Sequence, residues 1–358
     1  MAAWSLGAVG VSALLVSATV CVTSGCSTIG YYAQAATGHL ALLEAARPVP
    51  DWLADPATSA ALKQRLVLAE QIRDFAVSEL GEPDNASYRR YADLHRPAAV
   101  WNVVAAPELS LVSKTWCFPV VGCVGYRGYY ERAGADALAA ELHGEGLDVS
   151  VYGVPAYSTL GRLPTGGWFA DPLLNTFIDY PEGELARLIF HELAHQVAFA
   201  PGDTLFNESF ASTVEKIGAE LWLARHAGAA ARSDYDRAEA RRADFAALTA
   251  RYRDQLLALY ASAANDAEKR AGKAELLTRL RADYAVMKAT RWGGYAGYDG
   301  WFARANNAAF AILVSYTALV PAFERMYVRE GRDFGRFYAE VRRVAALAPA
   351  ERRAALER

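Results

Sequence analysis

Residues 182–199 read EGELARLIFHELAHQVAF, and this stretch decides how the centre of the chain folds. Its apolar residues recur at spacings of three and four, which is the period of one helix face. Pro181 lies just before the stretch and Pro201-Gly202 follow it, and these residues are typical of helix boundaries. We therefore predict a helix from Glu182 to Phe199 and a second helix from about Asp203 to His226.

The first predicted helix contains the pattern His191-Glu192-Leu193-Ala194-His195. Residues four apart lie one above the other on a helix face, so both imidazoles can reach a single metal ion. Glu192 projects about a third of a turn further round, where it can take a proton from water at the metal without binding the metal itself. This HExxH pattern is typical of zinc peptidases. The alternative is a helix whose two histidines are satisfied by hydrogen bonds.

The second predicted helix offers a third ligand, Glu208. A catalytic zinc site usually has three protein ligands and one open position. Glu215 lies seven residues, about two helical turns, beyond Glu208 and shares its face. It is placed to accept a hydrogen bond from a ligand histidine, although a solvated carboxylate is an equally consistent interpretation. We also predict that Asn207 supports the ligands from outside without binding the metal itself.

These motifs resemble the gluzincin metallopeptidases, whose third ligand is the Glu of a segment like NESFAS at residues 207–212. The spacing is most similar to that of a bacterial family labelled putative aminopeptidases, many of which are lipoproteins. Four further segments are similar to that family: YRGYY at 126–130, AYSTLG at 156–161, DPLLNT at 171–176 and NNA at 306–308. The resemblance covers roughly residues 30–340 and implies a zinc cofactor; one departure is a longer stretch at 162–167.

The order of predicted elements indicates an α+β fold. Predicted helices at Thr37–Ala46 and Ala57–Leu80 come first, and the rest of the chain beyond the active-site helices is helical. Strands rich in β-branched and aromatic residues lie between them: Ala99–Ala105, Gly128–Tyr130, Leu147–Val154 and Leu173–Ile178. We predict a gluzincin-like unit with a small mixed sheet followed by a largely helical C-terminal part, in about four segments broken near Asn265, Gly293–Gly300 and Gly331.

We assign residues 26–358 to one metallopeptidase domain: mixed α and β structure to about residue 180, active-site helices at 182–226, and a helical remainder. The chain is 53% hydrophobic and 22% charged, with a net charge of −3. This balance is typical of an ordinary globular protein and argues against nucleic acid as the main partner.

The amino terminus differs from the rest. Residues 1–25 contain no charged side chain, and an apolar run extends from about Leu6 to Val22 before Thr23-Ser24-Gly25-Cys26. This pattern favours a bacterial lipoprotein signal with Cys26 as the lipidated residue; a transmembrane anchor is the alternative. A Ser rather than an Asp at position 27, directly after the cysteine, resembles the pattern of lipoproteins that are sorted to the outer membrane. Both alternatives place the mature chain outside the cytoplasm, and the former predicts a periplasm-facing lipoprotein of the outer membrane.

Two other cysteines suit an oxidising compartment. Cys117 and Cys123 enclose a short, turn-prone loop and could form a small disulfide, although two separate buried thiols are equally consistent with the sequence.

Further features concern catalysis by such a peptidase. A hydrogen-bond donor should stabilise the oxyanion of the tetrahedral intermediate. We select Tyr316 first and Tyr157 second for this role; the alternative for each is a packed aromatic side chain. An extended peptide could pair with an edge strand, either Leu173–Ile178 or Val149–Val154, although each could be an ordinary strand.

An aminopeptidase also needs a carboxylate for the free ammonium group of its substrate, and Glu108, Asp171 and Glu182 are the candidates. The sequence thus predicts a zinc peptidase acting on peptides. Two alternatives are a catalytically inactive zinc-binding envelope lipoprotein that serves in interaction or assembly, and a zinc hydrolase of non-peptide amides or esters.

Overall fold

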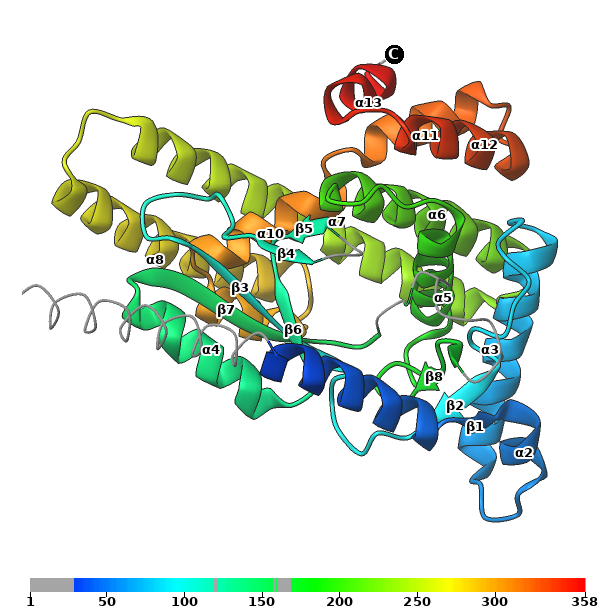
Figure 1. Cartoon of the computed structure of the whole chain (residues 1–358). Coiled ribbons are helices and arrows are strands. Elements are labelled where there is room, and N and C mark those ends of the chain that lie inside the picture. Colours follow the sequence, from blue (N-terminus) through cyan, green and yellow to red (C-terminus); the bar gives the residue numbers. More distant parts are fainter. Residues whose placement is uncertain (1–28, 119–121, 157–158, 160–168, 358) are drawn as a thin grey trace, which may run out of the picture.

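The computed structural model describes residues 29–118, 122–156, 159 and 169–357, without the side chains of 314–317. It is an α+β structure in which long helices surround three small sheets (Figure 1). The helices are residues 29–45, α2 (Val49–Ala54), α3 (Ala60–Ser78), α4 (Arg132–Gly144), α5 (Glu182–Val197), α6 (Thr204–Arg225), α7 (Ala229–Ala261), α8 (Asp266–Thr290), α9 (Asp299–Arg304), α10 (Asn307–Thr317), α11 (Val320–Arg329), α12 (Phe334–Ala345) and α13 (Pro349–Leu356). The strands are β1 (Arg47–Pro48), β2 (Arg90–Ala92), β3 (Val100–Pro107), β4 (Trp116–Phe118), β5 (Gly122–Val124), β6 (Arg127–Tyr129), β7 (Leu147–Val154) and β8 (Leu173–Leu174).

We predicted one small mixed sheet, and the strands form three separate small sheets, one of which is mixed. One has the order β1-β2-β8 and is mixed, one has the antiparallel order β6-β3-β7, and β4 pairs only with β5. The strand predicted at Leu173–Ile178 is limited to its first two residues. Beyond them the backbone turns, since the amides of Phe177 and Ile178 donate to the carbonyl of Leu174.

The β6-β3-β7 sheet is covered on both faces. Alternate residues of β3 face opposite sides, so Val103 and Ala105 pack against α4 while Val104 and Ala106 pack against α10. Helix α4 was not predicted from the sequence, because its apolar positions are mostly alanine. In the described part of the chain β7 lies at the edge of this sheet and β8 at the edge of the β1-β2-β8 sheet, so both strands that we considered for peptide pairing occupy edge positions.

A disulfide joins Cys117 in β4 to Cys123 in β5. The two cysteines are directly opposite each other in the antiparallel ladder, and the pairs on either side are Trp116 with Val124 and Phe118 with Gly122. The disulfide therefore closes the two-stranded hairpin, and it settles the alternative that the sequence left open.

Helices α5 and α6 lie in the largest hydrophobic core. That core also contains residues of the first helix, α3 and the α11–α13 group, and its fully buried members include Phe190, Phe206, Phe210 and Phe323. The predicted boundaries of both helices agree with the structure to within two residues. Their buried faces hold the HExxH motif on rigid elements.

The C-terminal part is helical as predicted, but it has seven helices rather than about four. The additional breaks follow capping signals: the Asn306 side chain caps α10, and Pro321 and Pro349 begin α11 and α13. Helices α7 and α8 pack against each other as a long antiparallel pair (Figure 1).

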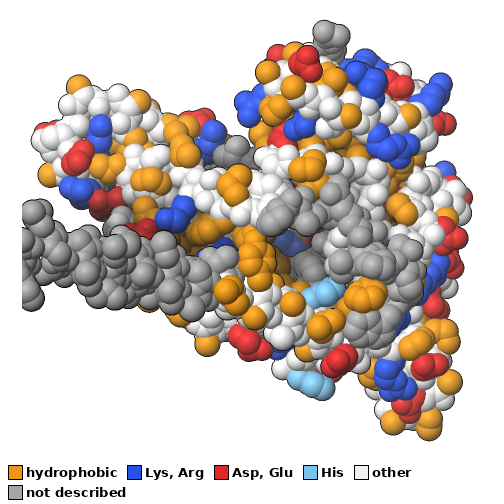
Figure 2. Space-filling model, viewed as in Figure 1, with side chains coloured by type: hydrophobic (Ala, Val, Ile, Leu, Met, Phe, Trp, Pro, Cys, Tyr) orange, Lys and Arg blue, Asp and Glu red, His pale blue; other side chains and the backbone are white. Residues whose placement is uncertain are grey.

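The face of the molecule in Figure 2 carries acidic and basic side chains interspersed over its helices, with no broad area of one sign. Within the described residues, no helix combines the length and the apolar character needed to span a bilayer. The lipidation candidate Cys26 and the apolar run before it lie outside the described residues.

Candidate active site

Helices α5 and α6 bring His191, His195 and Glu208 together. The Nε2 atoms of the two histidines are 3.2 Å apart, and Oε2 of Glu208 lies 3.3 Å from His191 Nε2 and 3.8 Å from His195 Nε2. Three donor atoms thus converge on one point, and this group could hold a metal ion.

The loop between α5 and α6 sets this convergence. Asn207 accepts a hydrogen bond from the Ala200 amide at 2.7 Å and donates one to the Ala200 carbonyl at 2.9 Å, both buried. Asp203 caps α6 by accepting from the Phe206 amide and also pairs with Arg352 of α13 at 2.6 Å. Asn207 is therefore a positioning residue, since its side chain fixes the turn that brings α6 back beside α5.

Burial controls the protonation of two groups at the site. It lowers the pKa of His195 to about 4, so that imidazole is neutral near pH 7 and its Nε2 lone pair is available to a metal. Burial also raises the pKa of Glu192 to about 7, although the charge of His191 opposes the rise. A carboxyl with a pKa near neutrality can both take and return a proton.

His191 is held from behind by Glu215. The Nδ1 atom of His191 lies 2.8 Å from Glu215 Oε2, which leaves Nε2 facing His195 and Glu208. Burial disfavours a charged Glu215, but the charges of Arg187 and His191 outweigh it and lower the Glu215 pKa to about 2. Burial likewise opposes protonation of His191, yet its hydrogen bonds to Glu208 and Glu215 raise its pKa. The two carboxylates thus favour positive charge at this position.

Arg187 extends this line of charges into α7. Its side chain is 15% exposed and pairs with Glu215 on one side and with Glu239 on the other. Arg242, one turn along α7, pairs with Glu239 and with Glu184 of α5, the latter at 2.7 Å. These five residues, which we call the rear network, connect the back of His191 to residues of α7 that lie more than forty positions further along the chain.

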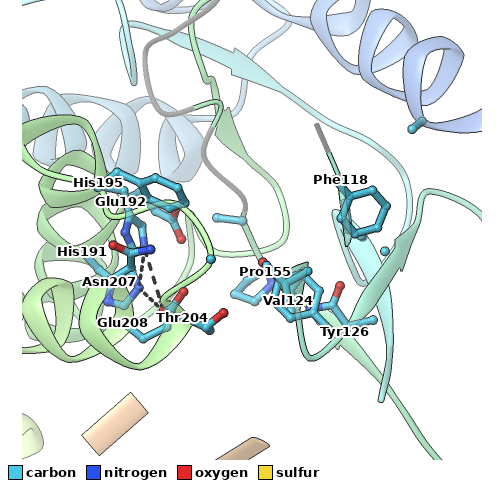
Figure 3. A pocket seen from close by; sticks show the side chains of 18 of the residues that line it. Phe118, Val124, Tyr126, Pro155, His191, Glu192, His195, Thr204, Asn207 and Glu208 are labelled. Carbon is cyan, nitrogen blue, oxygen red and sulfur yellow. Dashed lines mark hydrogen bonds and ion pairs between the residues drawn. The ribbon is translucent and has the colours of Figure 1, made fainter. Parts of the chain in front are cut away.

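A cleft of about 470 Å³ opens on the other side of the metal-binding group. One wall is formed by α5 and α6, with His191, Glu192, His195, Thr204 and Glu208. The facing wall holds Phe118, Val124, Tyr126 and Pro155, as Figure 3 shows. Tyr31 and Ala35 of the first helix also line the cleft.

The two tyrosines selected as oxyanion donors stay predictions. Tyr157 lies outside the described residues. Tyr316 lies near the end of α10, and its side chain is outside the description. Among described residues, Tyr126 lines the wall of the cleft that faces the group, and Tyr31 and Tyr130 also line the cleft.

The three carboxylates considered for a free ammonium do not line the cleft. Glu108 pairs with Arg270 at 2.8 Å, and Glu182 accepts from the Trp222 indole at 2.9 Å. Asp171 is 2% exposed and accepts from the amide and hydroxyl of Thr159.

Apart from Glu215, the residues of the rear network and of the facing wall of the cleft were not predicted from the sequence. Arg187 did carry a signal, because it lies four residues before His191 and therefore on the same face of α5. Glu239 and Arg242 carried none, since only the packing of α7 against α5 places them. Phe118 and Val124 are distant in sequence from the motif, and their role follows from the position of the hairpin.

Comparison with known proteins places the chain in a family. A family model described as "Putative aminopeptidase" matches residues 30–356, which include α5 and α6. No curated protein and no solved structure matches the chain. Because the match spans most of its length, the chain belongs to the putative aminopeptidase family.

Proposed function

We propose that the chain is a zinc-dependent peptidase in which His191, His195 and Glu208 bind zinc and Glu192 is the general base. The observation that carries the proposal is the convergence of three donor atoms at one end of a cleft, with Glu192 beside them. Membership of an aminopeptidase family supports a reaction on peptides.

The chemistry and spacing of the donors suit zinc. Zinc binds His nitrogen and carboxylate oxygen at 2.0–2.2 Å, so tetrahedral ligands around it lie about 3.4 Å apart. The three donor distances here, 3.2, 3.3 and 3.8 Å, bracket that value. Two histidines and one carboxylate are also a common ligand set of catalytic zinc.

When bound, zinc would activate a water molecule and polarise the carbonyl of the scissile bond. Glu192 would take a proton from the attacking water and return it to the leaving amine, which its near-neutral pKa allows. Glu215 would keep the His191 ring oriented through Nδ1, and Asn207 would keep α6 in register with α5.

We further propose that the enzyme acts in the cell envelope as a periplasm-facing lipoprotein of the outer membrane. The support is the sequence of the first 27 residues, with Cys26 as the lipidated residue. The disulfide between Cys117 and Cys123 suits an oxidising compartment.

The test is mass-spectrometric profiling of a peptide mixture with free and acetylated amino termini. It uses the zinc-loaded chain starting after Cys26, with Glu192→Gln as the matched control. Cleavage by the unchanged protein and not by the control supports a zinc peptidase. Stepwise loss from free termini alone would identify an aminopeptidase, whereas internal cuts in both sets would identify an endopeptidase. If zinc-loaded protein leaves every peptide intact, the proposed function is wrong.

A further inference from the structure

The disulfide-closed hairpin of β4 and β5 forms part of the substrate cleft. Phe118 from β4 and Val124 from β5 both line it, on the wall opposite the metal-binding group (Figure 3). Cys117 and Cys123 themselves are exposed on the other side of the hairpin, because successive residues of a strand point to opposite faces. The hairpin therefore turns its apolar side chains toward the site and its disulfide toward solvent.

Backbone contact fixes the hairpin against the active-site loop. Gly122 has a φ of +76°, and a Cβ atom built on it would lie only 2.6 Å from the amide nitrogen of Gly202. Gly202 belongs to the loop between α5 and α6, which carry the metal-binding residues. The position of the hairpin wall is thus tied to the position of His195 and Glu208, and this close approach requires glycine.

The rest of the facing wall has the same chemistry. Tyr126, Val154 and Pro155 continue it from the neighbouring strands, and burial raises the pKa of Tyr126, so its hydroxyl stays uncharged. Among the described residues that line the cleft, Asp203 is the acid apart from Glu192 and Glu208, and it is engaged by Arg352. The surface that a substrate side chain would meet is therefore mainly apolar and aromatic, with Asn102 as a polar member.

We propose that this hairpin wall, Phe118 and Val124 with Tyr126, Val154 and Pro155, selects peptides that carry an apolar or aromatic side chain next to the scissile bond. The proposal rests on the proposed peptidase function and names its substrate class. An apolar side chain is stabilised when it leaves water for such a wall, whereas a charged one loses hydration without gaining a partner. We expect kcat/KM for a peptide with Phe or Leu at this position to exceed that of its Asp counterpart by about 100-fold.

The test compares matched peptides that differ only in the residue beside the cut, with Phe, Leu, Lys or Asp there. Val124→Asp should lower kcat/KM for the Phe and Leu peptides by about 10- to 100-fold, mainly through KM, and raise the relative rate for the Lys peptide. The matched control is Val112→Asp, because Val112 is 72% exposed outside the cleft. Phe118→Ala serves as a second, milder variant. It should reduce kcat/KM for the Phe and Leu peptides without affecting kcat/KM for the Asp peptide.

Binding of the same peptides to the Glu192→Gln protein, followed by fluorescence anisotropy, separates the two proposals. Tighter binding of Phe and Leu peptides supports the hairpin wall, even for peptides that are not cut. Cleavage that is indifferent to the four residues, or unchanged selectivity in both hairpin variants, would overturn it while leaving the peptidase function intact. Absence of cleavage by zinc-loaded wild-type protein would instead count against the proposed function.

Discussion

The two sides of the α5–α6 pair differ in chemistry. Behind His191, the rear network of Arg187, Glu215, Glu239, Arg242 and Glu184 lines that side with paired charges. In front of it, the cleft is bounded by aromatic and aliphatic side chains from the hairpin wall. Both sides meet the same metal-binding group, yet they are built from opposite kinds of residue.

The difference separates two tasks. Hydrogen-bonded ion pairs are directional, and loss of one partner leaves the other charge uncompensated. The rear network can therefore fix the orientation of the His191 ring. Apolar contacts are non-directional and additive, so the front can accept a range of substrates with graded preference. We therefore expect changes in the rear network to affect metal binding and changes in the hairpin wall to affect substrate choice.

The largest expected effect lies at the junction of the two sides. Glu192→Gln removes the proton acceptor but keeps the shape of the side chain. We expect kcat to fall by about 10²- to 10⁴-fold, the usual contribution of a general base. Zinc content, measured by atomic emission, should not change, because Glu192 is not a ligand. A variant that loses zinc together with activity would show that this assignment of roles is wrong.

The second-largest effect is expected in the rear network. Arg187→Gln should weaken zinc binding by about 10- to 100-fold, as removal of an outer partner of a ligand histidine typically does. The reason is that Glu215 and Glu239 would lose the cation between them, and the carboxylate behind His191 would no longer be held. Competition with a fluorescent zinc chelator measures the affinity, and the absorption spectrum of the Co²⁺-substituted protein reports the ligand geometry.

Arg232→Gln is the matched control for that measurement. Arg232 also lies in α7 and also pairs with two acids, Glu220 and Asp236, but it is far more exposed. Its replacement should leave zinc affinity and the Co²⁺ spectrum unchanged. Equal zinc affinity in the two arginine variants would contradict an orienting role for the rear network.

The smallest effect is expected at the disulfide of the hairpin that lines the cleft. Replacing both Cys117 and Cys123 by serine opens the hairpin without touching a cleft-lining side chain. We expect KM for apolar peptides to rise by about two- to fivefold, less than one fully buried side chain contributes, while zinc affinity stays the same. Steady-state kinetics with the Phe and Leu peptides would measure it. A large fall in zinc affinity would mean that the hairpin supports the metal site rather than the substrate.

Helices α5 and α6 could be predicted from the sequence because the signals for them are local. Helical spacing alone places His191, His195 and Glu192, and a two-turn spacing relates Glu215 to Glu208. The family was likewise predicted from short motifs, and the match over residues 30–356 confirms it.

The rest of the site depends on contacts between distant segments. Glu239 reaches Arg187 only because α7 packs against α5, and Phe118 reaches the cleft only because the hairpin contacts Gly202. Neither relation leaves a periodic signal in the sequence. Helix α4 was missed for another reason: its buried face relies on Ala135 and Ala139, which give a weak apolar pattern.

We propose that the group formed by His191, His195 and Glu208 binds the zinc that makes the chain a peptidase. A decisive experiment strips the protein with a chelator and titrates zinc back while peptide cleavage and bound zinc are measured together. We expect cleavage to be lost on stripping and to return in proportion to zinc up to one equivalent. The Glu192→Gln protein should bind the same equivalent without cleaving. Cleavage that persists in the stripped protein, or a Glu192→Gln protein as active as wild type, would contradict this proposal.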